Sequence, residues 1–128
     1  MMKKLHEQEF AECAWKCVNK VKNEKYKDKY KSLAKRLPSM INANGLLTTV
    51  AFLKSKKGSK EHTEILKHLA TFLLKETEKG NNSTDEELIK KLIYSDFSEY
   101  LYYTKVALRF AVWLKRMAEA EIEGTDED

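Results

Sequence analysis

The sequence of 128 residues predicts an all-α protein, a single-domain bundle of about five or six helices with a long central C-terminal helix. Apolar residues recur with the 3.6-residue period of a helix along most of the chain, and no stretch alternates as a strand would. The composition, 42% hydrophobic and 34% charged, is that of a globular chain without a membrane-spanning run of ~18 apolar residues.

The first helix is expected from about Leu5 to Asn23, with Trp15 at the border of its apolar stripe. The stripe consists of Phe10, Ala14, Cys17, Val18 and Val21. Cys13 and Cys17, the only cysteines, are neighbours on this helix with poor geometry for a disulfide. No further ligands stand at a spacing that suits zinc, so a pair of buried, reduced thiols is expected.

The segment "EKYKDKYKSLAKRL" continues the helical pattern, with lysines around an apolar row of Tyr26, Tyr30, Leu33 and Leu37. Pro38 is expected to end this helix or to open the next, because proline at the first helical position loses no needed hydrogen bond.

The stretch "LPSMINANGLLTTVAFLKSK" is interpreted as one helix from Pro38 to about Lys57, ~30 Å long. In that helix Gly45 would let a neighbouring backbone approach closely, and Asn42 and Asn44 would bind a backbone group across the contact. The alternative is a helix that ends near Asn44, with Gly45 as a left-handed cap.

A short loop, "KKGSKE", offers Ser59 as the N-cap of a helix that runs to about Glu78, with an apolar face of Ile65, Leu66, Leu69, Phe72 and Leu73. The clearest break is "KGNNSTDEE". Ser83 with Glu86, or Thr84 with Glu87, would form a capping box for a short helix that contains Leu88, Ile89, Leu92 and Ile93.

Asp96 and Glu99 offer a second capping box, which opens the longest helix, extending to about Ile122. This helix is apolar on two adjoining faces, so several other helices are expected to cover it. The faces are Phe97, Leu101, Thr104, Leu108 and Ala111, and then Tyr103, Ala107, Phe110, Leu114 and Met117. Residues 124–128 are expected to form an acidic, frayed tail.

The sequence contains no recognisable catalytic motif, so the chain is predicted not to be an enzyme. It has no phosphate-binding glycine loop, no HExxH and no arginine followed shortly by histidine, as helical ribonucleases of the HEPN type have. The three histidines are scattered, and no metal or cofactor is expected. The aromatic stretch "YSDFSEYLYY" could stack on bases, but at helical spacing most of it is interpreted as core.

Charge is distributed unevenly along the chain. Residues 1–60 hold 15 Lys and Arg against 5 Asp and Glu, and residues 61–128 hold 9 against 15. A basic half suggests a polyanionic partner. With 21 lysines and 3 arginines, the chain is suited to contacts with a phosphate backbone and not to reading bases. The candidate nucleic-acid-binding residues are Lys16, Lys20, Lys35, Arg36, Lys54, Lys56 and Lys57, with Lys60 beside them.

Three local patterns resemble the small α-helical subunit of type III-B CRISPR effector complexes, the Cmr complexes. They are "LPSMINANGLLTTVAFLKSK", similar to LP-x-x-I-x-x-NGL-x-x-x-x-AFL-x-x-K, then "YKSLAKRLP", and the closing helix "YLYYTKVALRFAVWLKRMAEA". Together they cover about half of the chain. The part between "KSKK" and the last helix matches less well, and no contacts are carried over there.

The resemblance implies a non-catalytic scaffold in antiviral defence. Copies of such subunits stack beside a backbone that holds the guide RNA and help to line the channel of guide and target RNA, while other subunits carry the catalytic activities. The implied partners are the guide and target RNA, the backbone and large subunits and further copies of the chain, with no membrane and no small-molecule substrate.

Three other hypotheses are also compatible with the sequence. They are the small subunit of a type III-A complex, a free-standing helical DNA-binding module, and a protein-interaction adaptor that never touches nucleic acid. The DNA-binding hypothesis requires a helix-turn-helix with a polar recognition helix, and no segment clearly provides one. Residues 1–10 lack the apolar core of a signal peptide, which indicates a cytoplasmic protein.

Overall fold

A computed structural model describes residues 6–74 and 85–124, which form six helices and, within these ranges, no strand. The helices are α1 (His6–Val21), α2 (Lys27–Asn44), α3 (Leu46–Ser55), α4 (Lys60–Leu74), α5 (Asp85–Tyr94) and α6 (Phe97–Glu121). The predicted all-α class and the number of helices are thus confirmed. The expected end of the fourth helix near Glu78, the capping boxes that use Ser83 or Thr84, and nearly all of the acidic tail lie outside the described residues.

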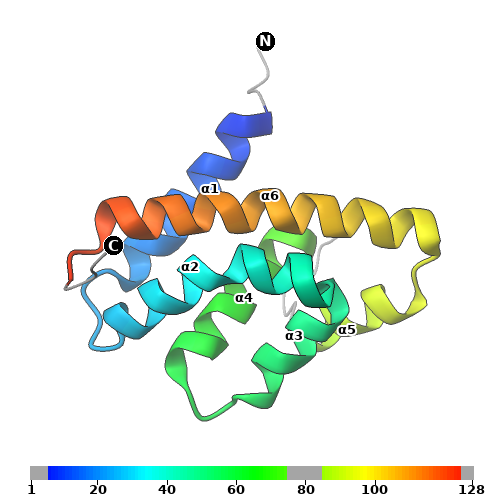
Figure 1. Cartoon of the computed structure of the whole chain (residues 1–128), viewed down its shortest axis with the longest axis horizontal. Helices are drawn as coiled ribbons and strands as arrows, with labels where there is room; N and C mark the ends of the chain where they lie inside the picture. Colours follow the sequence, from blue (N-terminus) through cyan, green and yellow to red (C-terminus); the bar gives the residue numbers. More distant parts are fainter. Residues whose placement is uncertain (1–5, 75–84, 125–128) are drawn as a thin grey trace.

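The long helix α6 extends along one side of the molecule and packs mainly on α1 and α2 (Figure 1). The fourth helix, α4, lies against α2, α3, α5 and α6, so the core forms where these helices meet. The apolar stripe predicted for α1 and that predicted for α4 are both buried. Phe72 of α4 is the centre of an aromatic row, with its ring centroid 5.2 Å from that of Phe10 and 4.5 Å from that of Phe110.

Pro38 lies inside α2 and neither ends nor begins a helix, so that prediction was wrong. Its missing N–H removes one backbone hydrogen bond, usually at a cost of ~3 kcal/mol in a helix interior. The helix continues because Leu37 and Ile41, on either side of the proline, are both buried in the core. Burial of these side chains therefore outweighs the local effect of proline.

The chain breaks at Gly45, between α2 and α3, so the prediction of one continuous helix from Pro38 to Lys57 was also wrong. Gly45 has φ +91° and ψ 159°, a region that only glycine adopts readily. This backbone conformation, and not the approach of another backbone, explains the glycine, because the nearest atom to an added Cβ would be the Tyr100 hydroxyl at 3.7 Å. Asn42 and Asn44 are exposed and do not bridge a close contact.

One side chain of α6, that of Tyr100, holds the start of α3 in place after the break. The Leu47 amide, in the first turn of α3, donates a hydrogen bond of 2.9 Å to the Tyr100 hydroxyl. The amide of Gly45 in turn donates to the Ile41 carbonyl, which completes the last turn of α2. Amides in the first turn of a helix lack partners within it, so Tyr100 stabilises the start of α3 and orients that helix against α6.

Substitution of Gly45 by alanine is expected to lower the free energy of unfolding by about 1–3 kcal/mol, because alanine is strained at this φ and ψ. Urea denaturation measures the loss. Gly58→Ala is the matched control, because nothing lies within 4 Å of the Cβ added there and the φ of Gly58 is not positive. Equal stability of the two variants would contradict this account of the break.

The start of α6 is the predicted capping box. The Glu99 amide donates to the Asp96 side chain at 2.9 Å, and the Asp96 amide donates to the Glu99 carboxylate at 3.2 Å. Of the two predicted apolar faces, the one centred on Ala107, Phe110 and Leu114 is buried.

The other face of α6 was wrongly predicted to be covered along its length. Phe97 is 76% exposed and Leu101 is 46% exposed, although Ala111 further along is buried. Three more large apolar side chains are exposed at this junction of α5 and α6, and we call the five together the apolar corner: Ile93, Tyr94, Phe97, Leu101 and Tyr102. The interpretation of "YSDFSEYLYY" as mostly core therefore fails for Tyr94, Phe97, Leu101 and Tyr102.

Lysines near the junction of α1 and α2 hold the C-terminal end of α6. The buried Lys31 ammonium donates to the Ile122 carbonyl at 2.9 Å, and Lys27 donates to the Glu123 carbonyl at 3.3 Å. Lys22 lies 3.7 Å from the Glu121 carboxylate. Cations are favourable at the C-terminal end of a helix, so these members of the basic half have a structural role. None of the described helices is long and apolar enough to cross a membrane.

Candidate nucleic-acid interface

The candidate basic residues lie on three helices and one loop, and the structure brings only some of them together. Lys16 and Lys20 are exposed on α1, and Lys16 forms an ion pair of 3.2 Å with Glu12 one turn earlier. Lys35 is half-buried on α2. The helices α1 and α3 do not pack closely against each other, because α1 packs mainly on α6, and α3 packs on α2, α4 and α5. The lysines of the first three helices therefore do not form a single continuous row.

One basic group surrounds His62 at the start of α4. The Lys56 ammonium lies 5.3 Å from the centroid of the Phe52 ring, which packs edge-on against His62 at 5.6 Å. Burial lowers the pKa of His62; Glu61 opposes this change, whereas Lys56 and Arg36 contribute to it. Arg36 and Lys56, from α2 and the end of α3, thus lie close enough to His62 to influence its charge.

The environment of Arg36 is not purely basic. Arg36 lines a hollow between α2 and α4 together with Lys29, His62 and the carboxylates of Asp28 and Glu61. These two carboxylates reduce the attraction that Arg36 offers to an anion. Lys56 is the more available cation of this group.

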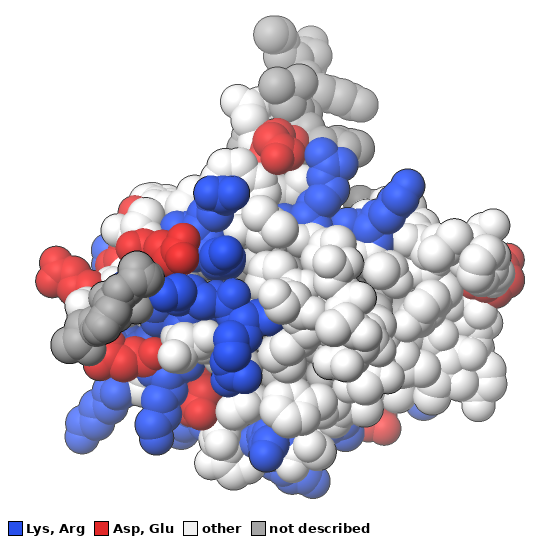
Figure 2. Space-filling model, in the orientation of Figure 1, with Lys and Arg blue, Asp and Glu red and all other residues white. Residues whose placement is uncertain are grey.

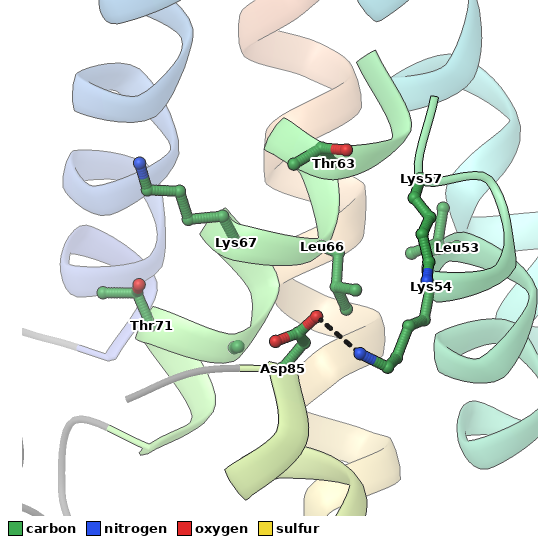
Figure 3. Close-up of a pocket in the computed structure, with 9 residues that line it drawn as sticks. Leu53, Lys54, Lys57, Thr63, Leu66, Lys67, Thr71 and Asp85 are labelled. Atoms are coloured by element: carbon green, nitrogen blue, oxygen red, sulfur yellow. Dashed lines mark hydrogen bonds and ion pairs between the residues drawn. The ribbon is translucent and has the colours of Figure 1, made fainter. Parts of the chain in front are cut away.

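A second basic group lines a cavity of about 430 Å³ between α3, α4 and the start of α5. It contains Lys54 and Lys57 from the end of α3 and its loop, and Lys67 from the exposed side of α4. In Figure 3 the Lys54 and Lys57 side chains lie on one side of Leu66, and Lys67 lies on the other. The cavity therefore has cations on two opposite rims.

Two carboxylates of α5 engage Lys54. The Lys54 ammonium lies 3.3 Å from Asp85 and 3.5 Å from Glu86 (Figure 3). The hydrogen bond to Asp85 holds the pKa of Lys54 above its usual value. Lys54 is thus positively charged but already has two anionic partners, whereas Lys57 and Lys67 have no ion pair within the described residues.

Lys67 and Lys20 both lie close enough to the buried His68 to influence its charge. His68 is 6% exposed; burial lowers its pKa to about 4, and Lys67 and Lys20 contribute. Its Nδ1 lies 2.9 Å from the Tyr30 hydroxyl and its Nε2 lies 3.4 Å from Glu64. A neutral imidazole protonated on Nε2 satisfies both contacts, because it donates to Glu64 and accepts from Tyr30.

His68 makes stability depend on pH. Its folded-state pKa is about 4 and its ordinary value is 6.5, so its contribution is complete above pH 6.5 and is lost as the pH falls toward 4. We expect the free energy of unfolding to fall with decreasing pH in this window by up to about 1.4 kcal/mol per unit more steeply than in a His68→Gln variant. Urea denaturation between pH 7 and about 4.5 measures both slopes. Parallel slopes would show that His68 is not buried in its neutral form.

Both cysteines are free, and Cys17 is buried as predicted, whereas Cys13 is only partly buried, so the prediction of two buried thiols was wrong for Cys13. Cys17 is buried, and a hydrogen bond to Cys13 together with burial raises the pKa of its thiol. A thiol with a raised pKa is a poor nucleophile and a poor metal ligand. Within residues 6–74 and 85–124 no three His, Cys, Asp or Glu side chains are arranged to hold a metal ion.

Sequence reasoning missed Lys67 and Asp85, the two residues that complete the cavity. One signal was available, because Thr63, Lys67 and Thr71 follow one another at intervals of four and therefore share the polar side of α4. The pairing of Lys54 with Asp85 joins residues 31 positions apart. No local pattern predicts such a contact.

The distribution of charge over one face of the molecule is uneven (Figure 2). Lys and Arg, with some Asp and Glu, gather around the end where α6 finishes and α2 begins, whereas this face shows few charged side chains over the N-terminal half of α6. Ion pairs also join the two halves of the sequence, for example Lys54 with Asp85 and Arg109 with Glu7 at 3.5 Å. The basic and acidic halves are thus folded together and partly neutralise each other.

Comparisons with known proteins agree along nearly the whole chain. Residues 6–121 match the family model described as CRISPR-associated protein (Cas_Cmr5). The chain is 30% identical over 123 residues to the CRISPR system Cmr subunit Cmr5 of Thermotoga maritima, covering 94% of this chain and 87% of that protein. The fold is similar to the crystal structure of a CRISPR-associated Cmr5 family protein from Thermus thermophilus, with a TM-score of 0.80 and 27% identity, covering 94% of this chain and 100% of that one.

Proposed function

Because the chain belongs to the Cmr5 family of CRISPR-associated proteins, we propose that it is the non-catalytic small subunit of a type III-B Cmr complex that targets RNA. In this role it assembles with the backbone and large subunits and contributes basic side chains to the channel of guide and target RNA. The observation that supports the assignment most is the match to the family model, which extends from α1 to the end of α6.

The basic side chains favour contact with a phosphate backbone over the reading of bases. Lys56, Lys57 and Lys67 lie on or beside the neighbouring helices α3 and α4, and all three are exposed. Lysine attracts phosphate without fixing a base, and a subunit repeated along an RNA must tolerate every sequence. This arrangement supports a sequence-independent contact with guide or target RNA.

We base the proposed self-stacking on apolar surfaces, because ion pairs within the chain partly neutralise the charges of the two sequence halves. The described residues expose large apolar side chains at two places, the apolar corner and Trp15 of α1, which is 46% exposed. A contact between two different surfaces of identical chains repeats head to tail and forms a filament. The corner of one copy against the Trp15 side of the next would give such a contact.

The test of the proposed function is target-RNA binding by an assembled complex, measured against salt concentration in the presence and absence of this chain. The salt dependence of binding counts the phosphate contacts, so it separates an RNA-lining subunit from an adaptor that only holds proteins together.

A further inference from the structure

The cavity between α3, α4 and the start of α5 combines an apolar floor with charged rims. Leu53, Leu66 and Ala70 line its interior, and all three are almost completely buried. In Figure 3 the Leu66 side chain points into the space between α4 and the end of α3. A cavity of about 430 Å³ is large enough for one small ligand and too small for a folded element.

The rims of this cavity carry the groups that hold a phosphate. Lys57 and Lys67 stand on opposite sides, and the hydroxyls of Thr63 and Thr71 lie along α4. A simple anion would be held by the lysines alone and would leave most of the 430 Å³ cavity unfilled. A ligand with a flat, largely apolar body and a phosphate satisfies both parts of the lining, because its body covers the floor and its phosphate meets the rim.

We propose that this cavity is a nucleotide pocket: it takes one unstacked nucleotide, its base on Leu53, Leu66 and Ala70 and its flanking phosphates on Lys57 and Lys67. The proposal rests on the proposed function, which brings a single RNA strand to this side of the molecule. The same chemistry is present in a free nucleoside monophosphate and in a nucleotide within a strand, and the experiment below distinguishes the two sources.

In this pocket the carboxylates of Asp85 and Glu86 compete with the phosphate for the ammonium group of Lys54. Their carboxylates hold the Lys54 ammonium at 3.3 and 3.5 Å, at one end of the cavity. A phosphate that approaches the pocket exchanges with these carboxylates for Lys54. The acidic first turn of α5 thereby keeps the affinity for any single nucleotide low, as a subunit that must release its RNA requires.

The experiment is a titration of the full-length chain, observed through its amide resonances, with uridine monophosphate, uridine and ribose 5-phosphate. The monophosphate is expected to shift amides of α3, α4 and the first turn of α5 and to bind at least about fivefold more tightly than either fragment. Thr71→Trp, which fills the pocket from an exposed position, is expected to abolish these shifts. The Lys57→Gln, Lys67→Gln double variant is expected to weaken binding about tenfold.

A charge-neutralising double variant and a control test whether the acidic residues weaken nucleotide binding. Asp85→Asn with Glu86→Gln is expected to tighten binding about threefold, because it releases Lys54. Lys105→Gln is the control, because it removes an exposed lysine of α6 that does not line the cavity. Equal shifts with ribose 5-phosphate, shifts scattered over the surface, or preferential binding of a glutamate-rich peptide at this place would overturn the pocket.

The assembled complex distinguishes this inference from the proposed function. There Thr71→Trp is expected to weaken the binding of a uridine homopolymer about threefold, which shows that the pocket holds a nucleotide of a strand. Unchanged binding with Thr71→Trp, while charge reversal at Lys56 and Lys57 weakens it, would overturn the pocket and leave the proposed function standing. Unchanged binding with both sets of variants would overturn the two together.

Discussion

Reversal of charge at Lys56 and Lys57 is expected to weaken target-RNA binding by the assembled complex about tenfold or more at physiological salt. Both side chains are exposed at the end of α3, and neither forms an ion pair within the described residues. Each Lys→Glu change removes an attraction to phosphate and adds a repulsion. Filter binding or fluorescence anisotropy with a complementary target RNA measures the loss.

Lys54 is left unchanged in this experiment for a structural reason. It is held between Asp85 and Glu86, so Lys54→Glu would bring three carboxylates together and push α3 away from α5. A loss of RNA binding in that variant would then report on the fold and not on the interface. The sequence alone placed Lys54 with Lys56 and Lys57 as equivalent candidates, and the structure separates them.

The matched control for the charge reversal is Lys90→Glu with Lys105→Glu. These exposed lysines of α5 and α6 give the same change of net charge and do not line the cavity. Binding that falls equally in both double variants would mean that only the net charge matters. Such a result would remove Lys56 and Lys57 from the interface.

Substitution of Tyr94 and Phe97 by serine is expected to abolish stacking of the chain while leaving it folded. The two side chains are 82% and 76% exposed, so their loss changes the free energy of unfolding by only about 0.5 kcal/mol. At an interface, two central aromatic side chains each contribute about 2 kcal/mol or more, so the double variant is expected to weaken association several hundredfold. Sedimentation at high protein concentration, and the number of copies retained in the assembled complex, measure the effect.

Two comparisons make this prediction decisive. Trp15→Ser is expected to weaken stacking in the same way, because it removes the opposing surface of a head-to-tail contact, whereas Lys105→Ser is expected to have no effect. If Tyr94→Ser, Phe97→Ser releases a different subunit and leaves the number of copies of this chain unchanged, the apolar corner contacts that subunit. If neither stacking nor assembly changes, the corner is not an interface.

The sequence predicted best those features that depend on residues close to one another. The Asp96–Glu99 capping box needs only two residues three positions apart, and the stripes of α1 and α4 follow from one helical period. The break between α2 and α3 was misplaced because its cause is distributed over the fold. Burial of Leu37 and Ile41 carries the helix through Pro38, and Tyr100 of α6 fixes the start of α3 after Gly45.

The surface could be predicted only in part. Helical periodicity identified Phe97 and Leu101 as one face of α6, but it cannot show whether another helix covers that face, and none of those described does. The composition indicated a basic interface without showing which lysines are held in ion pairs. Lys22, Lys27 and Lys31 bind the end of α6, and Lys54 binds α5, through contacts between distant parts of the chain.

The central claim is that this chain contributes lysines to the binding of an RNA backbone within a Cmr complex. The measurement that tests it most directly is the affinity of the assembled complex for target RNA over a range of salt concentrations, with and without this chain. If about four lysines of this chain neutralise phosphates of a single strand, omission of the chain is expected to make the slope of log K against log[salt] shallower by about 3. The same slope and the same affinity without the chain would contradict the claim.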